Sequence, residues 1–147
     1  MVNKNGEKPV VILLVEDNPG DVWLIKEILH ENDFLNKLYV VGNGEDAIDF
    51  LHKRNKFSKA PLPDLVLLDL NLPRKDGRDV LSEIKTDPEL CDIPVIVLTS
   101  SGAEQDMLKS YECHANCYIT KPINLDEFVK VIKSIKDFWG KMLKRQG

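Results

Sequence analysis

Five short apolar runs, each followed by a segment of helical periodicity, constrain the fold of this chain more than any other feature. The runs are "VVILLV" from Val10, "LYVV" from Leu38, "DLVLLDL" from Asp64, "PVIVLT" from Pro94 and "NCYIT" from Asn116. They are rich in β-branched residues and mostly lack polar alternation, which is typical of parallel strands covered on both faces. The repeated β-α order predicts a doubly wound parallel sheet with helices on both sides.

The segments that follow the runs place apolar residues at helical spacing. They begin at Asn18, Asn43, Arg78, Gly102 and Asn124. The last of them, "NLDEFVKVIKSIKDFW", is predicted to form a helix with an apolar stripe of Leu125, Phe128, Val129, Ile132 and Ile135. Gly77, just before the third segment, is predicted to allow a left-handed turn. Trp23 is interpreted as a packing or dimer contact.

The size and composition of the chain bound its class. A length of 147 residues suits one domain, so we expect a single domain over 1–147 with its core at about 10–139, short flexible termini and no linker to a second domain. No apolar stretch is long enough to span a membrane, and the N-terminus lacks the apolar core of a signal peptide. Three cysteines, an odd number, indicate no disulfide framework. We therefore expect a cytoplasmic protein, and the net charge of -4 argues against nucleic acid as its main partner.

Polar side chains stand where the predicted strands end. Glu16 and Asp17 follow the first run, Asp69 lies near the end of the third, Thr99 ends the fourth, and Lys121 follows the fifth. In a flavodoxin-like (βα)5 sheet of strand order 2-1-3-4-5, the first and third strands are neighbours and ligands bind beyond their carboxyl ends. The three acids should therefore converge. Two carboxylates about 4 Å apart repel by ~4 kcal/mol at an effective dielectric near 20, so they require a cation. Oxygen ligands of this kind suit Mg²⁺.

Asp69 in this setting is either a plain ligand or a nucleophile that accepts a phosphoryl group as an acyl phosphate. Phosphoryl transfer mainly requires positioning and neutralisation of charge on the equatorial oxygens, which Mg²⁺, Lys121 and the Thr99 hydroxyl would supply. Each residue also has an ordinary explanation. Asp17 or Asn18 could cap a helix, Asp69 could belong to a turn, and Lys121 could be a surface lysine. Their coincidence at one edge favours a shared site.

Four motifs at the strand ends resemble those of the receiver domain of two-component response regulators. They are "LLVEDN", "LLDLNLPRKDG", "VLTSS" and "YITKP", and they occur in this order. The resemblance extends from Val10 to about Trp139, and finer details are similar to single-domain regulators that partner phytochrome-type kinases. It implies a signalling module that is activated by phosphorylation and that assists its own phosphorylation and dephosphorylation. It does not imply an enzyme with a separate substrate.

The resemblance also implies a role for each site residue. Asp69 would take a phosphoryl group from a histidine kinase or phosphorelay. Asp17, Asp69 and the Asn71 backbone carbonyl would bind Mg²⁺, with Glu16 acting through a metal-bound water. Thr99 and the Ser100 backbone amide would hold phosphoryl oxygens, and Lys121 would pair with one of them. The peptide bond between Lys121 and Pro122 would be cis.

Signalling in such a domain would depend on a switch. The resemblance implies that Thr99 moves toward the phosphoryl group and Tyr118 turns inward, altering a face made by the fourth helix, fifth strand and fifth helix. Homodimerisation through this face is expected. Two alternatives remain: a haloacid dehalogenase-type Mg²⁺-dependent phosphatase and a phosphate-independent interaction module. The phosphatase class needs a second carboxylate two residues after its nucleophile, where this chain has Asn71.

Overall fold

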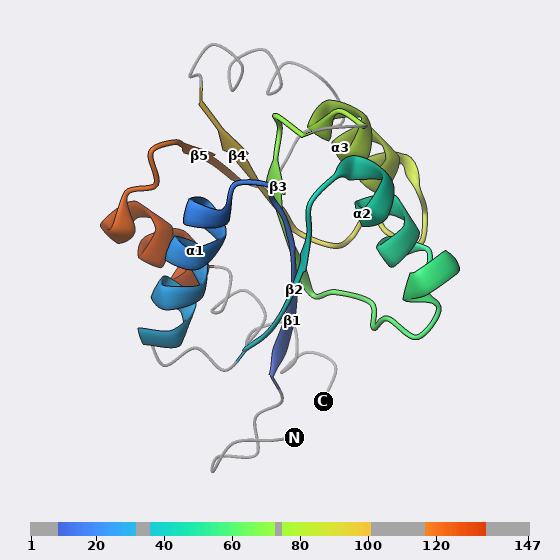
Figure 1. The fold of residues 1–147 in the computed structure, drawn as a ribbon, viewed down its shortest axis with the longest axis horizontal. Helices are drawn as coiled ribbons and strands as arrows, with labels where there is room; N and C mark the ends of the chain where they lie inside the picture. The colour runs from blue at the N-terminus through green and yellow to red at the C-terminus, as the bar shows by residue number, and fades with distance from the viewer. Residues whose placement is uncertain (1–8, 32–35, 73–74, 101–116, 135–147) are drawn as a thin grey trace.

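The computed structural model describes residues 9–31, 36–72, 75–100 and 117–134. Within these residues a parallel five-stranded sheet has the order β2-β1-β3-β4-β5, as Figure 1 shows. The strands are β1 (Val10–Val15), β2 (Asn36–Val41), β3 (Leu65–Asp69), β4 (Val95–Thr99) and β5 (Cys117–Thr120). The predicted strand order is confirmed, and each strand lies in or next to its predicted apolar run.

The strand register brings the carboxyl ends of neighbouring strands to one edge of the sheet. Val15, the last residue of β1, is paired with Leu68 of β3. Asp69 is therefore level with the residue that follows β1. At the other side of β3, Asp69 is paired with Leu98, and Thr99 ends β4 opposite Thr120 of β5. Any side chains that leave these strand ends start from a common edge.

Helices cover both faces of the sheet (Figure 1). Helix α1 (Pro19–Glu31) and the helical residues 125–134 lie on one face, and α2 (Gly44–Leu51) and α3 (Gly77–Thr86) lie on the other. A short 3-10 helix, η1 (Asn55–Phe57), lies in the connection between α2 and β3. The fourth predicted helix, from Gly102, lies outside the described residues. Of the helices in the described ranges, none has the length and apolar character needed to cross a bilayer.

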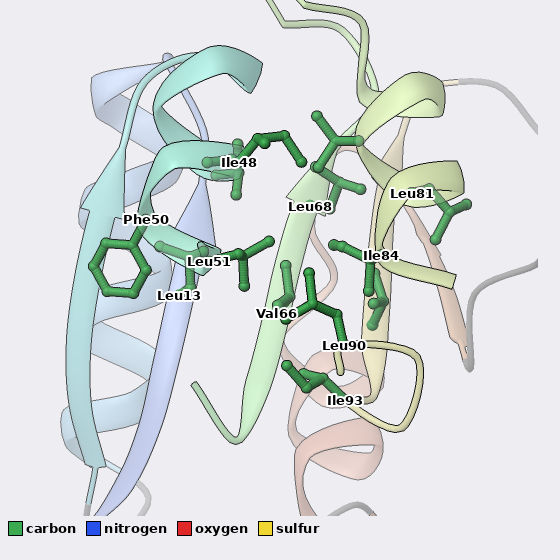
Figure 2. Packing of buried hydrophobic residues seen from close by; sticks show 14 of the residues in the cluster. Leu13, Ile48, Phe50, Leu51, Val66, Leu68, Leu81, Ile84, Leu90 and Ile93 are labelled. Atoms are coloured by element: carbon green, nitrogen blue, oxygen red, sulfur yellow. The ribbon is translucent and has the colours of Figure 1, made fainter. Parts of the chain in front are cut away.

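Two apolar clusters, one on each face of the sheet, form the core. Leu13 and Val15 of β1 contribute to the cluster under α2 and α3, whereas Ile12 and Leu14 contribute to the cluster under α1 and residues 125–134. Figure 2 shows the first cluster, in which side chains of α2 and α3 meet those of the central strands. Because both faces of each central strand are buried, alternation along the strand sorts side chains between two cores. This explains why the apolar runs of the central strands do not alternate with polar residues.

Two side chains differ from their predicted placement. Leu125 is 50% exposed, whereas Phe128 on the same helix is fully buried. Leu125 begins this helix, and among its described residues 125–134 Phe128 and Ile132 are buried in the second cluster. Ile135, the last member of the predicted stripe, lies outside the described residues. Trp23 is 63% exposed, because the buried face of α1 is formed by Ile25, Ile28 and Leu29. The packing interpretation of Trp23 is therefore wrong, and a role in dimer contacts stays a prediction.

Gly77 also differs from its prediction. It is the first residue of α3 and does not adopt a left-handed conformation. A Cβ at this position would lie 2.5 Å from the Leu70 Cα and 2.6 Å from the Asp69 carbonyl oxygen. The Gly77 N–H donates to the Leu70 carbonyl at 3.1 Å. Glycine is therefore required because the start of α3 packs directly against the end of β3.

Candidate functional site

Three carboxylates meet at the carboxyl edge of the sheet, as the sequence predicts. Glu16 and Asp17 directly follow β1, and Asp69 is the last residue of β3. One oxygen from each of the three carboxylates lies within 4.8 Å of the other two. Glu16 and Asp69 are buried and Asp17 is exposed. Clustered carboxylate oxygens with one side open to solvent match the ligands that a hard divalent cation prefers.

Lys121 lies against the same carboxylates. Its Nζ is 2.9 Å from the Glu16 Oε2 and 3.1 Å from the Asp69 Oδ2. Its backbone N–H donates to the Thr99 carbonyl at 2.7 Å, which fixes the residue after β5 to the end of β4. The bond between Lys121 and Pro122 is cis, as the resemblance implies. The alternative reading of Lys121 as a surface lysine is therefore wrong.

Asp21 is a fourth carboxylate at this edge, and it was not predicted as a site residue. Its Oδ2 lies 2.9 Å from the Lys121 Nζ. Asp21 belongs to the first turn of α1, and the first turn of a helix after a strand end faces the same edge as the strand end itself. The sequence feature that could have indicated Asp21 is its position four residues after Asp17. It was missed because acids in a first helical turn are common for reasons of helix polarity alone.

Burial and the neighbouring charges change the ionisation of Glu16 and Lys121. Burial raises the pKa of Glu16 to about 7, and the Asp69 carboxylate adds to this effect while Lys121 opposes it. Burial lowers the pKa of Lys121, but the hydrogen bonds to Asp21 and Glu16 outweigh this and raise it above its ordinary value. Four carboxylates and one ammonium carry a formal charge of -3 (four negative charges and one positive). The acidic cluster can therefore bind a divalent metal, which would offset most of this charge.

Both oxygens of Asp69 are held by neighbours. The Asn71 backbone N–H donates to the Asp69 Oδ1 at 3.0 Å, and Lys121 donates to the Oδ2. The Asn71 side-chain amide donates in turn to the Ser100 hydroxyl at 3.4 Å. Asn71 thus links the end of β3 to the segment after β4. An oriented carboxylate of this kind is suited to act as a ligand or as a nucleophile.

The remaining predicted residues lie at or near the same edge. Thr99 is fully buried at the end of β4, and Ser100 follows it and is exposed. Tyr118 is half-buried in β5, where it pairs with Val97 and packs against the cluster under α2 and α3. Thr99 and Ser100 therefore lie at the carboxyl end of the strand next to β3, and Tyr118 lies two residues before the end of β5. The movements predicted for Thr99 and Tyr118 stay predictions.

Comparison with known proteins gives a consistent result. The family described as "Response regulator receiver domain" matches residues 12–133. Response regulator Rcp1 from Synechocystis sp. is 47% identical over 131 residues, which cover 89% of this chain and 89% of Rcp1. The crystal structure of the Mn²⁺-bound form of Rcp1 has a TM-score of 0.76 and covers 89% of this chain and 94% of that one.

Two further solved structures are similar. The phosphorylated cyanobacterial phytochrome response regulator RcpA is 46% identical, with a TM-score of 0.76 and coverage of 90% of this chain and 94% of that chain. The bacteriophytochrome response regulator RtBRR is 38% identical, with a TM-score of 0.80 and coverage of 86% and 77%. The family match over residues 12–133 includes nearly all of the described strands and helices.

Proposed function

Because this chain belongs to the response regulator receiver family and is homologous to a phosphorylated regulator, we propose that Asp69 is its phosphoacceptor and Lys121 its main phosphate-binding cation. The observation that carries this proposal is the contact of Lys121 with a buried, strand-end Asp69 inside a cluster of acids. A lone surface carboxylate would lack both the positioning and the charge compensation that phosphoryl transfer requires.

The proposed reaction takes a phosphoryl group from the phosphohistidine of a histidine kinase or phosphotransfer protein. A carboxylate oxygen of Asp69 attacks phosphorus and forms the O–P bond of an acyl phosphate. The N–P bond breaks, and the leaving imidazole nitrogen keeps the electron pair and takes up a proton. Asn71 and Lys121 hold the Asp69 oxygens before attack. Lys121, the Thr99 hydroxyl and the Ser100 amide then bind the phosphoryl oxygens, so this chain assists a transfer in which it is itself the substrate.

Mg²⁺ fits the acidic cluster, and the Mn²⁺-bound form of Rcp1 supports a divalent cation in a relative. We assign Asp17, Asp69 and the Asn71 carbonyl as its ligands, with Glu16 acting through water. When bound, the cation offsets the negative charge of the carboxylates and of the incoming phosphoryl group. The formal excess of three negative charges at the site is the physical reason to expect it.

Output from the site is proposed to pass through Thr99 and Tyr118. Thr99 would move toward the phosphoryl group and Tyr118 would turn inward, altering the face formed by the fourth helix, β5 and the last helix. A second copy of the chain or a downstream protein would bind there. The phosphoryl group can drive this change only through its different interactions with the two states. The fourth helix lies outside the described residues, so the arrangement of this face rests on the resemblance.

The remaining assignments follow from the same proposal. The whole of 1–147 forms one receiver domain with its core at about 10–139. We propose a cytoplasmic location because the chain has three cysteines, an odd number that indicates no disulfide framework and fits a reducing compartment. We expect protein partners rather than nucleic acid, since the net charge is -4.

The phosphatase alternative is not favoured, because Asn71 stands where its acid-base carboxylate is needed.

Labelling with acetyl phosphate tests the proposal. The wild-type protein should take up about one phosphoryl group per chain in a Mg²⁺-dependent reaction, and Asp69→Asn should take up none because the nucleophilic oxygen is lost. Mass spectrometry of the intact protein would measure the product. Asp64→Asn is the matched control, since Asp64 lies just before the other end of β3, and it should label normally. Undiminished labelling of Asp69→Asn, or rapid turnover of small phosphate esters, would contradict the proposal.

A further inference from the structure

The Lys121 ammonium group is saturated by carboxylates. Its Nζ lies within 3.1 Å of four oxygens: two from Glu16, one from Asp21 and one from Asp69. An ammonium has only three N–H donors. A phosphoryl oxygen on Asp69 can therefore accept a hydrogen bond from Lys121 only if one of the four present oxygens loses its hydrogen bond to Lys121.

Burial indicates which acceptor can leave. The side chains of Glu16 and Asp69 are 0% and 4% exposed, whereas that of Asp21 is 24% exposed. Glu16 contacts Lys121 through both oxygens and also accepts from the Asn18 N–H at 3.2 Å. Asp69 cannot move out of the site, because it carries the phosphoryl group that Lys121 must bind. Asp21 is therefore the carboxylate that can return to water at the lowest desolvation cost.

The position of Asp21 is fixed by the start of α1. The Asn18 side-chain oxygen accepts from the Gly20 N–H at 2.9 Å and from the Asp21 N–H at 3.1 Å. The Asn18 carbonyl also accepts from the Val22 N–H at 3.0 Å. The backbone of Asp21 thus has a defined place in the first turn, and only its side chain can move between Lys121 and solvent. The Asp21 ion pair joins α1 to the residue after β5 while Asp69 is unmodified.

We propose that Asp21 is a positioning residue that holds Lys121 in the unphosphorylated protein and competes with the phosphoryl group for it. This inference rests on the proposed function of Asp69 and Lys121. Phosphorylation exchanges the Asp21 oxygen on Lys121 for a phosphoryl oxygen, so the ion pair between α1 and the end of β5 opens. Asp21 accordingly weakens phosphoryl binding and sets how readily the site is occupied.

Binding of beryllofluoride, a non-covalent mimic of the phosphoryl group, measures this competition at equilibrium. With saturating Mg²⁺ and fluorine NMR as the readout, Asp21→Asn should bind beryllofluoride roughly fivefold more tightly than wild type, the factor that corresponds to loss of a partly exposed ion pair. Asp21→Glu, which keeps the charge, should bind more weakly than Asp21→Asn and close to wild type. A merely structural role for Asp21 would not separate these two variants in this direction.

Removal of one negative charge at the same edge could also tighten anion binding, and a control separates the two effects. Glu45 lies in the first turn of α2, after a neighbouring strand, and is not among the contacts of Lys121. Glu45→Gln removes the same charge and should leave beryllofluoride affinity close to wild type. Equal tightening by Glu45→Gln and Asp21→Asn, or no tightening by Asp21→Asn, would overturn the inference while the proposed function stands. Absence of binding to the wild-type protein would overturn the proposed function itself.

Discussion

At the scale of single residues, the contact of Gly77 with the end of β3 ties backbone packing to the phosphoacceptor. The absent Cβ leaves room for the Asp69 carbonyl and the Leu70 Cα, which are both backbone atoms and cannot rotate away. A side chain here would have to move either α3 or the strand end that presents Asp69. The requirement is one of space and not of backbone conformation.

Gly77→Ala should therefore lower stability by about 1–3 kcal/mol, the usual cost of overpacking a close contact, and should slow labelling of Asp69 by acetyl phosphate. Urea denaturation and mass spectrometry would measure the two effects. Gly42→Ala is the matched control, because its added Cβ meets no atom within 4 Å. That variant should be neutral or slightly stabilised. A Gly77→Ala protein as stable as Gly42→Ala would show that the contact is relieved at no cost.

At the scale of elements, the first turn of α1 determines where the acidic edge meets a helix. Asn18 caps this turn with its side chain and its carbonyl and also donates to Glu16. One residue thereby orients both a buried carboxylate of the site and the helix that carries Asp21. Capping of a helix by Asn18 was predicted as an alternative to a shared site, whereas in the structure the cap helps to build the site.

Asn18→Ala should lower the free energy of unfolding by about 1 kcal/mol, because two N–H groups of the first turn lose their acceptor. Asn18→Ser keeps a capping oxygen and should retain most of that stability. Urea denaturation of both variants would measure the difference. Equal stability of the Ala and Ser variants would mean that water replaces the cap without loss.

At the scale of the whole molecule, the last helix closes the second core cluster. Phe128 is fully buried among residues of α1 and the sheet, while Leu125 on the same helix is half exposed. Two apolar side chains three residues apart therefore make unequal contributions to stability. Their difference measures how strongly this helix is bound to the sheet.

Phe128→Ala should cost about 3–5 kcal/mol through lost burial and the cavity that remains. Leu125→Ala should change stability by no more than about 0.5 kcal/mol, as is usual for an exposed position. Denaturation followed by circular dichroism would compare the two variants. A similar loss for both would contradict the burial found at either position.

The sequence by itself determined the positions of the strands along the chain, their order in the sheet and three of the four acids at the acidic edge. It could do so because parallel strands buried on both faces need unbroken apolar runs, and because side chains that follow such runs must emerge at one edge. Only the tertiary structure decided that Asp21 reaches Lys121, that Gly77 serves close packing and that Leu125 faces solvent. These outcomes depend on how the elements pack against one another in space, which a local pattern of residue types does not encode.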